Sequence, residues 1–114
     1  MSARMRRVDE AVREVLSDAV LQDLKDPRIG FVTVTDVKTS ADLRHARVFF
    51  SVLGTDEERA ATLEGLQSAH SILQARVGRE LRMKRTPTLQ FVYDDTAERA
   101  ARVEEILGEV VDDE

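Results

Sequence analysis

The chain has 114 residues, with 17 Lys and Arg against 22 Asp and Glu, a formal net charge of −5 and no cysteine. Its length fits one domain, and 42% hydrophobic residues suffice for a packed core. The lack of cysteine excludes disulfides and thiolate chemistry, and no apolar run approaches the ~20 residues that span a bilayer. We therefore expect one cytoplasmic domain over residues 1–114, with a core at 3–94, a helix at 95–111 and an acidic tail at 112–114.

The first segment predicts a helix. Apolar residues recur at spacings of three and four from Met5 to Val20, which places them on one helical face. Pro27 should end this helix. The arginines lie near its start and Asp23 and Asp26 near its end, which is the reverse of what the helix dipole prefers. We infer that the early arginines have another task.

Two strands should follow. Residues 31–37 are β-branched and alternate until Asp36 and Val37, where we expect an irregularity. Residues 44–53 form a second alternating run, and the short turn between the two runs predicts an antiparallel hairpin. The inward face of the second strand would carry Ala46, Val48, Phe50 and Val52, and the open face of the sheet would carry polar residues such as Thr33, Thr35, Arg47, Ser51 and Gln90.

A capping box at Thr55 and Glu58 begins a long helical pattern that continues to Met83. This length exceeds the usual helix of a compact domain, so we expect a bend at Gly65, at Gly78 or in the polar stretch 68–71. A third strand at 89–93 and a last amphipathic helix then complete the chain. The inward residues of the long helix would be Ala61, Leu63, Leu66, Ala69, Ile72, Leu73 and Val77, and the apolar face of the last helix would be Ala97, Ala100, Val103, Ile106, Leu107 and Val110.

This order predicts an α+β fold. The second and third strands are joined by more than 30 residues, which implies a right-handed crossover and parallel pairing. A two-layer sandwich with helices on one face of the sheet, and an extra C-terminal helix, fits the pattern.

Catalytic signatures are missing from the sequence. His45 and His70 have no nucleophile placed by a known motif, and there is neither a G-x-S-x-G elbow nor a phosphate-binding glycine loop. The acidic pair Asp94-Asp95 and the acidic C-terminus are better explained by helix capping and solvation than by cation binding. We expect a protein that is not an enzyme and has no metal, cofactor or small-molecule substrate.

The net charge hides a strong asymmetry. Residues 94–114 carry nine acids and two bases, a net charge of −7, whereas residues 1–93 carry a net charge of +2. From residue 76 to residue 85 there are five bases against the single acid Glu80. Arginines three residues apart on a helix share one flank and can bind phosphates bidentately. With only five aromatic residues, the chain is suited to the phosphates and shape of structured RNA rather than to stacked bases.

Three blocks, residues 26–37, 42–54 and 81–94, together resemble the bacterial ribosome-binding factor A family. The resemblance extends from about Arg4 to Val110, and it implies a type II KH-like fold, helix–strand–strand–helix–kink–helix–strand. The Gly-x-x-Gly loop of ordinary KH domains is absent, as in the family, which has a helix kink marked Ala-x-Gly. Ala69, His70 and Ser71 match this kink, with serine in place of glycine.

The resemblance implies a non-catalytic assembly factor for ribosome biogenesis. Such a protein would bind the small (30S) ribosomal subunit, assist late maturation and processing of 16S rRNA, and support cold adaptation as a monomer in the cytoplasm, away from membranes. The alternative is a protein-interaction module that docks through its open sheet face or its acidic C-terminal helix. The residues expected to bind RNA are Arg76, Arg79, Arg82, Lys84 and Arg85, the N-terminal Arg4, Arg6 and Arg7, and Lys38, Arg44 and Arg47.

Overall fold

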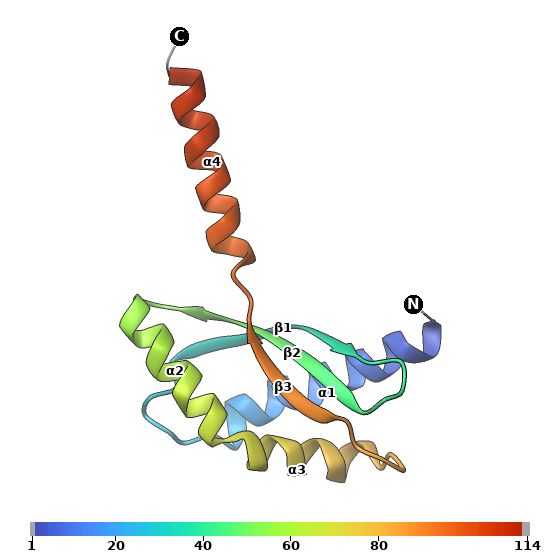
Figure 1. The fold of residues 1–114 in the computed structure, drawn as a ribbon. Helices are drawn as coiled ribbons and strands as arrows, with labels where there is room; N and C mark the ends of the chain where they lie inside the picture. The colour runs from blue at the N-terminus through green and yellow to red at the C-terminus, as the bar shows by residue number, and fades with distance from the viewer. Residues whose placement is uncertain (1, 113–114) are drawn as a thin grey trace.

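The computed structural model describes residues 2–112 and contains four helices and three strands in the predicted order (Figure 1). This order agrees with the type II KH-like arrangement, followed by one additional helix. The acidic tail lies largely outside the described residues, because only Asp112 is included, as the end of the last helix. The elements are α1 Ala3–Gln22, β1 Phe31–Thr39, β2 His45–Leu53, α2 Asp56–Ser68, α3 His70–Leu81, β3 Thr88–Tyr93 and α4 Thr96–Asp112.

The sheet has the order β1-β2-β3. β1 and β2 pair antiparallel with Phe31 opposite Leu53, and the register shifts between Val34 and Asp36, which confirms the expected irregularity. β2 and β3 pair parallel, as the long crossover predicted. The four residues expected on the inward face of β2 are buried.

Helices α1, α2 and α3 cover one face of the sheet and leave the other open (Figure 1). Val12 and Leu16 of α1 and Leu73 and Val77 of α3 are nearly inaccessible and pack with the inward residues of the strands. Ile72 was expected in this core and is instead 51% exposed, because Ala69, Leu73 and Val77 form the buried face of this segment and Ile72 lies to one side of it. The result is the predicted two-layer sandwich.

The long helical pattern breaks at Ala69. This residue has φ −87° and ψ 5°, outside the helical region, and it serves both as the end of α2 and as the residue before α3. His70 then begins α3 and its ring nitrogen lies 2.8 Å from the carbonyl oxygen of Leu89, which ties the break to β3. The bend is not at Gly65 or Gly78, because both residues lie inside helices. Ile29 packs so closely against Gly65 that a larger side chain would not fit there.

Helix α1 ends at Gln22, earlier than Pro27 predicted. The chain leaves the helix at Asp23, and Leu24 packs instead against the core as part of the loop to β1. The acids near this end have a structural task. Arg76 of α3 donates to Asp18 and, at 2.6 Å, to Asp23, so that one guanidinium links α3 to α1.

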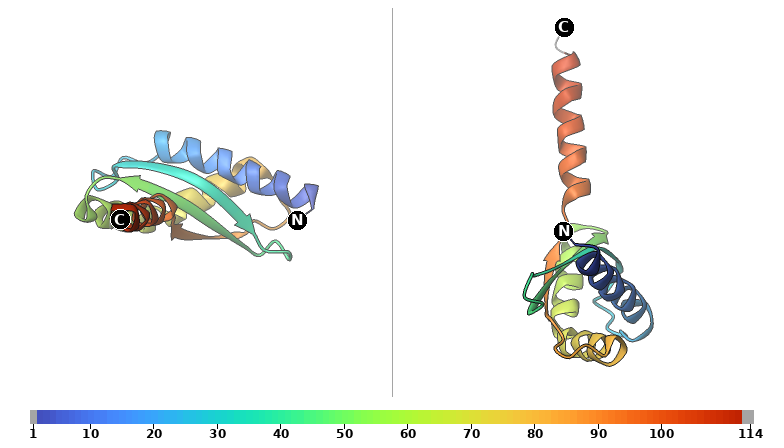
Figure 2. Two further views of the ribbon diagram at one scale, coloured as in Figure 1. Left: turned by 90° about the horizontal axis from the view of Figure 1, so that it is seen from above. Right: turned by 90° about the vertical axis from the view of Figure 1, so that its right-hand side faces the viewer.

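Helix α4 projects away from the sandwich, so that the molecule measures 61 × 38 × 17 Å (Figures 1 and 2). Asp94 forms its root: the backbone N–H of Asp94 donates to Phe50, and its carboxylate accepts from Thr35 at 2.7 Å and from the backbone N–H of Thr96 at 3.0 Å. The hydroxyl of Thr96 also donates to this carboxylate. These hydrogen bonds lower the pKa of Asp94, and the one from the Thr96 hydroxyl is the largest cause. The apolar residues Val103, Ile106 and Leu107 of α4 are more than half exposed.

We expect Gly65→Ala to reduce the free energy of unfolding by about 1–3 kcal/mol, because a Cβ there would lie 2.6 Å from Cγ1 of Ile29. Gly78→Ala is the matched control. Its Cβ would meet only Oγ1 of Thr86 at 3.4 Å, so stability should stay the same or rise by up to ~1 kcal/mol. Urea denaturation measures the free energy of unfolding of both variants. Equal changes in the same direction would contradict the predicted clash at position 65.

We expect Arg76→Met to destabilise the protein, because the apolar stem is kept while three carboxylates, Asp18, Asp23 and Glu80, lose their shared cation. Arg79→Met removes an exposed arginine with no salt bridge within residues 2–108 and should change stability by less than about 0.5 kcal/mol. Thermal unfolding of the two variants compares them. If the melting temperature falls no further for Arg76→Met than for Arg79→Met, the link between α1 and α3 is unimportant for stability.

Candidate nucleic-acid interface

Three segments far apart in the sequence meet at one end of the sandwich: the start of α1, the turn between β1 and β2, and the loop between α3 and β3. They surround a hollow of about 600 Å³. We call it the basic hollow, and its lining residues are Arg4, Asp42, Leu43, Met83, Lys84 and Arg85.

Hydrogen bonds hold these segments together. The buried carboxylate of Asp9 accepts from the backbone N–H of Thr39 at 2.9 Å, which fixes the first turns of α1 beside the end of β1. The backbone N–H of Thr88 donates to the carbonyl of Arg44 at 2.8 Å and joins the turn to β3. The start of α1, the turn and the beginning of β3 are therefore joined to one another, and the segments that carry the cations attach to this frame.

Asp42 organises the turn itself. Its Oδ1 accepts from the hydroxyl of Ser40 at 2.6 Å and from the backbone N–H of Arg44 at 3.0 Å. These hydrogen bonds lower the pKa of Asp42, with the Ser40 hydroxyl as the largest cause. The guanidinium of Arg44 is 3.9 Å from the same carboxylate and 63% exposed, so that this ion pair is weak.

Within residues 2–112, two non-glycine residues have a left-handed backbone, and both belong to this end of the molecule. Leu43 has φ 61° and lines the hollow, and Arg82 has φ 47° at the end of α3, one residue before Met83. Such conformations are disfavoured for side chains with a Cβ and are enriched at functional sites. They direct the chain sharply around the hollow.

The cations of the hollow are available to a ligand. Arg4, Lys84 and Arg85 are exposed, and none forms a salt bridge with another described residue. Arg4 also lies in the first turn of α1, where the helix dipole adds positive potential. Three unpaired cations with about half a positive charge from the helix make an anion-binding surface.

A second group of cations lies on the open sheet face. Lys38 and Arg47 are cross-strand partners, and both side chains lie over the ring of Phe49, at 5.6 Å and 5.1 Å from its centroid. They line a hollow of about 360 Å³ together with Asp36, Asp94 and Asp95. This site has mixed charge, so its attraction for phosphate is weaker than that of the basic hollow.

The expected ladder of Arg76, Arg79 and Arg82 on one helical flank is wrong. The guanidinium of Arg76 is 15% exposed and binds Asp18, Asp23 and Glu80, which raise its pKa, with Glu80 as the largest cause. Arg82 lies beyond the last helical residue, so it does not continue the flank of Arg79. Salt bridges across α1 and α3 could not be read from the spacing within one helix.

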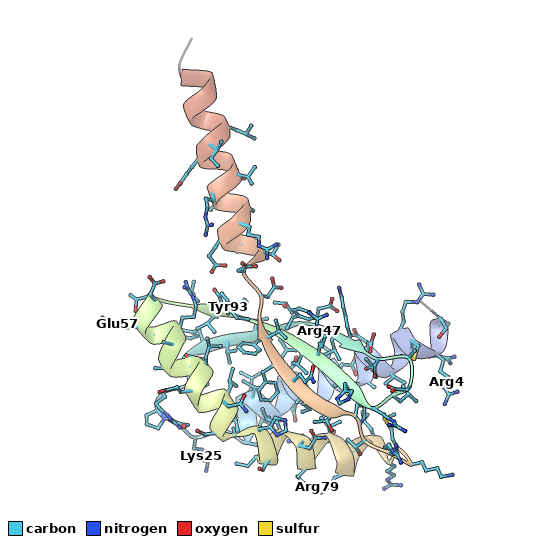
Figure 3. The ribbon with its side chains drawn as sticks, viewed as in Figure 1. Arg4, Lys25, Arg47, Glu57, Arg79 and Tyr93 are labelled. Atoms are coloured by element: carbon cyan, nitrogen blue, oxygen red, sulfur yellow. The ribbon has the colours of Figure 1, made fainter. Side chains whose placement is uncertain are left out.

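The predicted RNA-binding residues do not form one surface. Figure 3 places Arg4 at one end of the molecule, Arg79 on the outer side of α3 and Arg47 on the open sheet face. Arg6 lies with Lys38 in a further hollow of about 350 Å³ between α1 and β1, next to Asp9 and Asp36. Arg6, Arg7, Arg79 and Arg82 are exposed. Arg4, Lys84 and Arg85 share a hollow in which Asp42 is the one lining acid among the described residues.

The two histidines of the chain lie in different surroundings. His45 is exposed, and His70 contacts the carbonyl of Leu89 and the ring of Phe91. Among the side chains of residues 2–108, no cluster of three metal-ligating groups occurs. In the part of the chain that the structure describes, no helix is long and apolar enough to cross a membrane.

Several residues of the site have no clear signal in the sequence. Leu43 and Met83 line the basic hollow, and the turn composition around Ser40 and Asp42 indicates only a corner there. A contact at the root of α4 also has no such signal: the hydroxyl of Tyr93 donates to Glu98 while Arg59 lies over the Tyr93 ring. Residues of three different elements meet in that contact, and no sequence spacing indicates it.

Comparisons with known proteins agree with this fold. The family model described as ribosome-binding factor A matches residues 4–107. The chain is 45% identical to ribosome-binding factor A of Halothermothrix orenii over 97% of its own length and 91% of the relative.

Two solved structures are also similar. The solution structure of a Thermotoga maritima protein described as a putative ribosome binding factor A has 34% identity and a TM-score of 0.71, covering 81% of this chain and 88% of that one. A homology model of the Thermus thermophilus factor, fitted into a cryo-EM map of a complex with the 30S subunit, has 29% identity and a TM-score of 0.63. It covers 75% of this chain and 90% of that one. The chain belongs to the ribosome-binding factor A family.

Proposed function

We propose that this protein binds the small ribosomal subunit without catalysis, and that the basic hollow holds phosphates of 16S rRNA. The single observation that carries the proposal is the convergence of Arg4, Lys84 and Arg85 from two separate segments around one hollow. Cations fixed on a frame match the fixed phosphate positions of structured RNA. Few aromatic side chains are available to stack on bases, so phosphate and shape would dominate recognition.

Other exposed cations would extend the contact around the hollow. Arg6, Arg7, Arg79 and Arg82 are exposed and form no salt bridge within residues 2–108, and Lys38 and Arg47 would contribute more weakly because acids surround them. Arg44 would contribute once its weak pairing with Asp42 is exchanged for a phosphate. Arg76 is removed from the proposed interface, because it already has three carboxylate partners.

The Thermus thermophilus relative, fitted into a map of its 30S complex, supports the small subunit as the partner. In this proposal a cytoplasmic, monomeric factor binds one conformation of the rRNA during late maturation and so supports growth in the cold. Because no turnover is involved, its effect on the RNA equals at most its difference in affinity for the two conformations.

We expect Lys84→Gln with Arg85→Gln to weaken binding to purified small subunits and to reduce the steepness of the log–log salt dependence by about 1.4–1.8 units. The physical reason is that two phosphate contacts, and the counterions they release, are lost. Co-sedimentation at a series of salt concentrations measures both quantities.

The matched control is Lys25→Gln with Arg28→Gln, which removes the same charge at two exposed positions in the loop before β1, away from the hollow. It should leave the slope within error of the wild type. If both double variants change binding equally, the effect comes from net charge alone, and the assignment to the basic hollow is wrong.

A further inference from the structure

Helix α4 has an apolar face that the protein does not cover. Val103, Ile106 and Leu107 are 55%, 54% and 59% exposed, and their spacing of three and four residues places them on one side of the helix. An apolar stripe of this spacing is the feature that helical peptides insert into grooves on partner proteins. Figure 2 shows that the helix projects from the sandwich, where a partner can reach it.

The root of α4 gives the helix a defined direction. Thr35 donates to Asp94 from the open sheet face, while Tyr93 and Arg59 both contact Glu98 in the first turn. Hydrogen bonding from Tyr93 is the largest cause of the lowered pKa of Glu98, so this carboxylate stays ionised and paired. The contacts at its start therefore hold α4 in a defined direction relative to the sheet.

The open sheet face of the same chain is poorly suited to cover the apolar stripe of α4. Its centre carries Lys38, Arg47 and Asp36, which are charged, exposed and unsuited to covering Ile106 or Leu107. Folding back would also require the contacts of Asp94 and Glu98 to break.

RNA and a second copy of the chain are disfavoured by charge. Residues 94–114 carry nine acids and two bases, so this segment repels phosphates and repels itself. Glu105 lies on the side of the helix away from the stripe, and Glu104 lies at its flank. Charge complementarity therefore favours a basic protein with an apolar groove.

We infer that α4 is a docking arm whose apolar stripe enters a groove on a basic protein of the small ribosomal subunit. This inference rests on the proposed function, since a protein that lies on rRNA carries a basic surface to neutralise phosphates. The factor then holds the subunit at two places of different chemistry: phosphates at the basic hollow and protein at α4.

Photo-cross-linking in the full chain tests the occupant. The photoreactive residue benzoylphenylalanine replaces Ile106 in one variant and Ala101, which is exposed on the opposite side of the helix, in the other. After irradiation with purified small subunits, the Ile106 variant should give a cross-link to a ribosomal protein, identified by mass spectrometry, and the Ala101 variant should give little or none. Cross-links from position 106 to rRNA, or to a second copy of the chain, would overturn the inference.

Binding measurements give an independent readout. Ile106→Gln with Leu107→Gln keeps helix propensity while removing the apolar stripe, and should weaken binding about tenfold or more with an unchanged salt slope. Ala101→Gln should bind like the wild type, and circular dichroism checks that all variants remain helical. Wild-type affinity in the double variant would overturn the docking arm alone, whereas failure of the unmodified chain to co-sediment would remove the proposed function as well.

Discussion

The break at Ala69 is the constraint on which the rest of the sandwich depends. An uninterrupted helix over α2 and α3 would extend beyond a three-stranded sheet, because each strand has only six to nine residues. The break lets α2 pack near the Tyr93 end of β3 while α3 crosses beneath the sheet and meets α1. Leu73 and Val77 of α3 are then fully enclosed, and the loop after α3 arrives beside the start of α1. The basic hollow follows from this geometry.

Arginines in this protein divide into two groups by their partners. Arg76 is surrounded by carboxylates of two helices and is part of the framework. Arg4 and Arg85, like Lys84, are left unpaired among the described residues, at a place where two segments converge. The same residue type therefore has opposite tasks, and the distinction depends on which acids the fold brings within reach. A net charge of −5 says nothing about this distinction.

Much of the fold could be predicted from the sequence, because apolar periodicity reports burial directly. The alternation in β2 and the spacing in α3 identified residues that are indeed buried, such as Val48 and Leu73. Periodicity does not predict contacts between residues far apart in the chain. Asp18 and Arg76 are 58 residues apart, so the sequence pattern did not indicate their salt bridge. Periodicity failed for α4 in another way, because an amphipathic pattern indicates a side that is suited to burial and does not say which molecule buries it. For the hollow, the basic composition was visible, but the convergence of its three segments was not.

The two left-handed corners have an evolutionary consequence. Glycine would adopt the backbone of Leu43 or Arg82 with ease, whereas a residue with a Cβ loses of order 1 kcal/mol or more in that conformation. A chain selected for stability alone would place glycine at both corners. This protein has a leucine and an arginine there, and these residues place an apolar side chain in the basic hollow and an exposed cation beside it. Sequence variation in relatives should therefore be read at these corners as a balance between robustness and recognition.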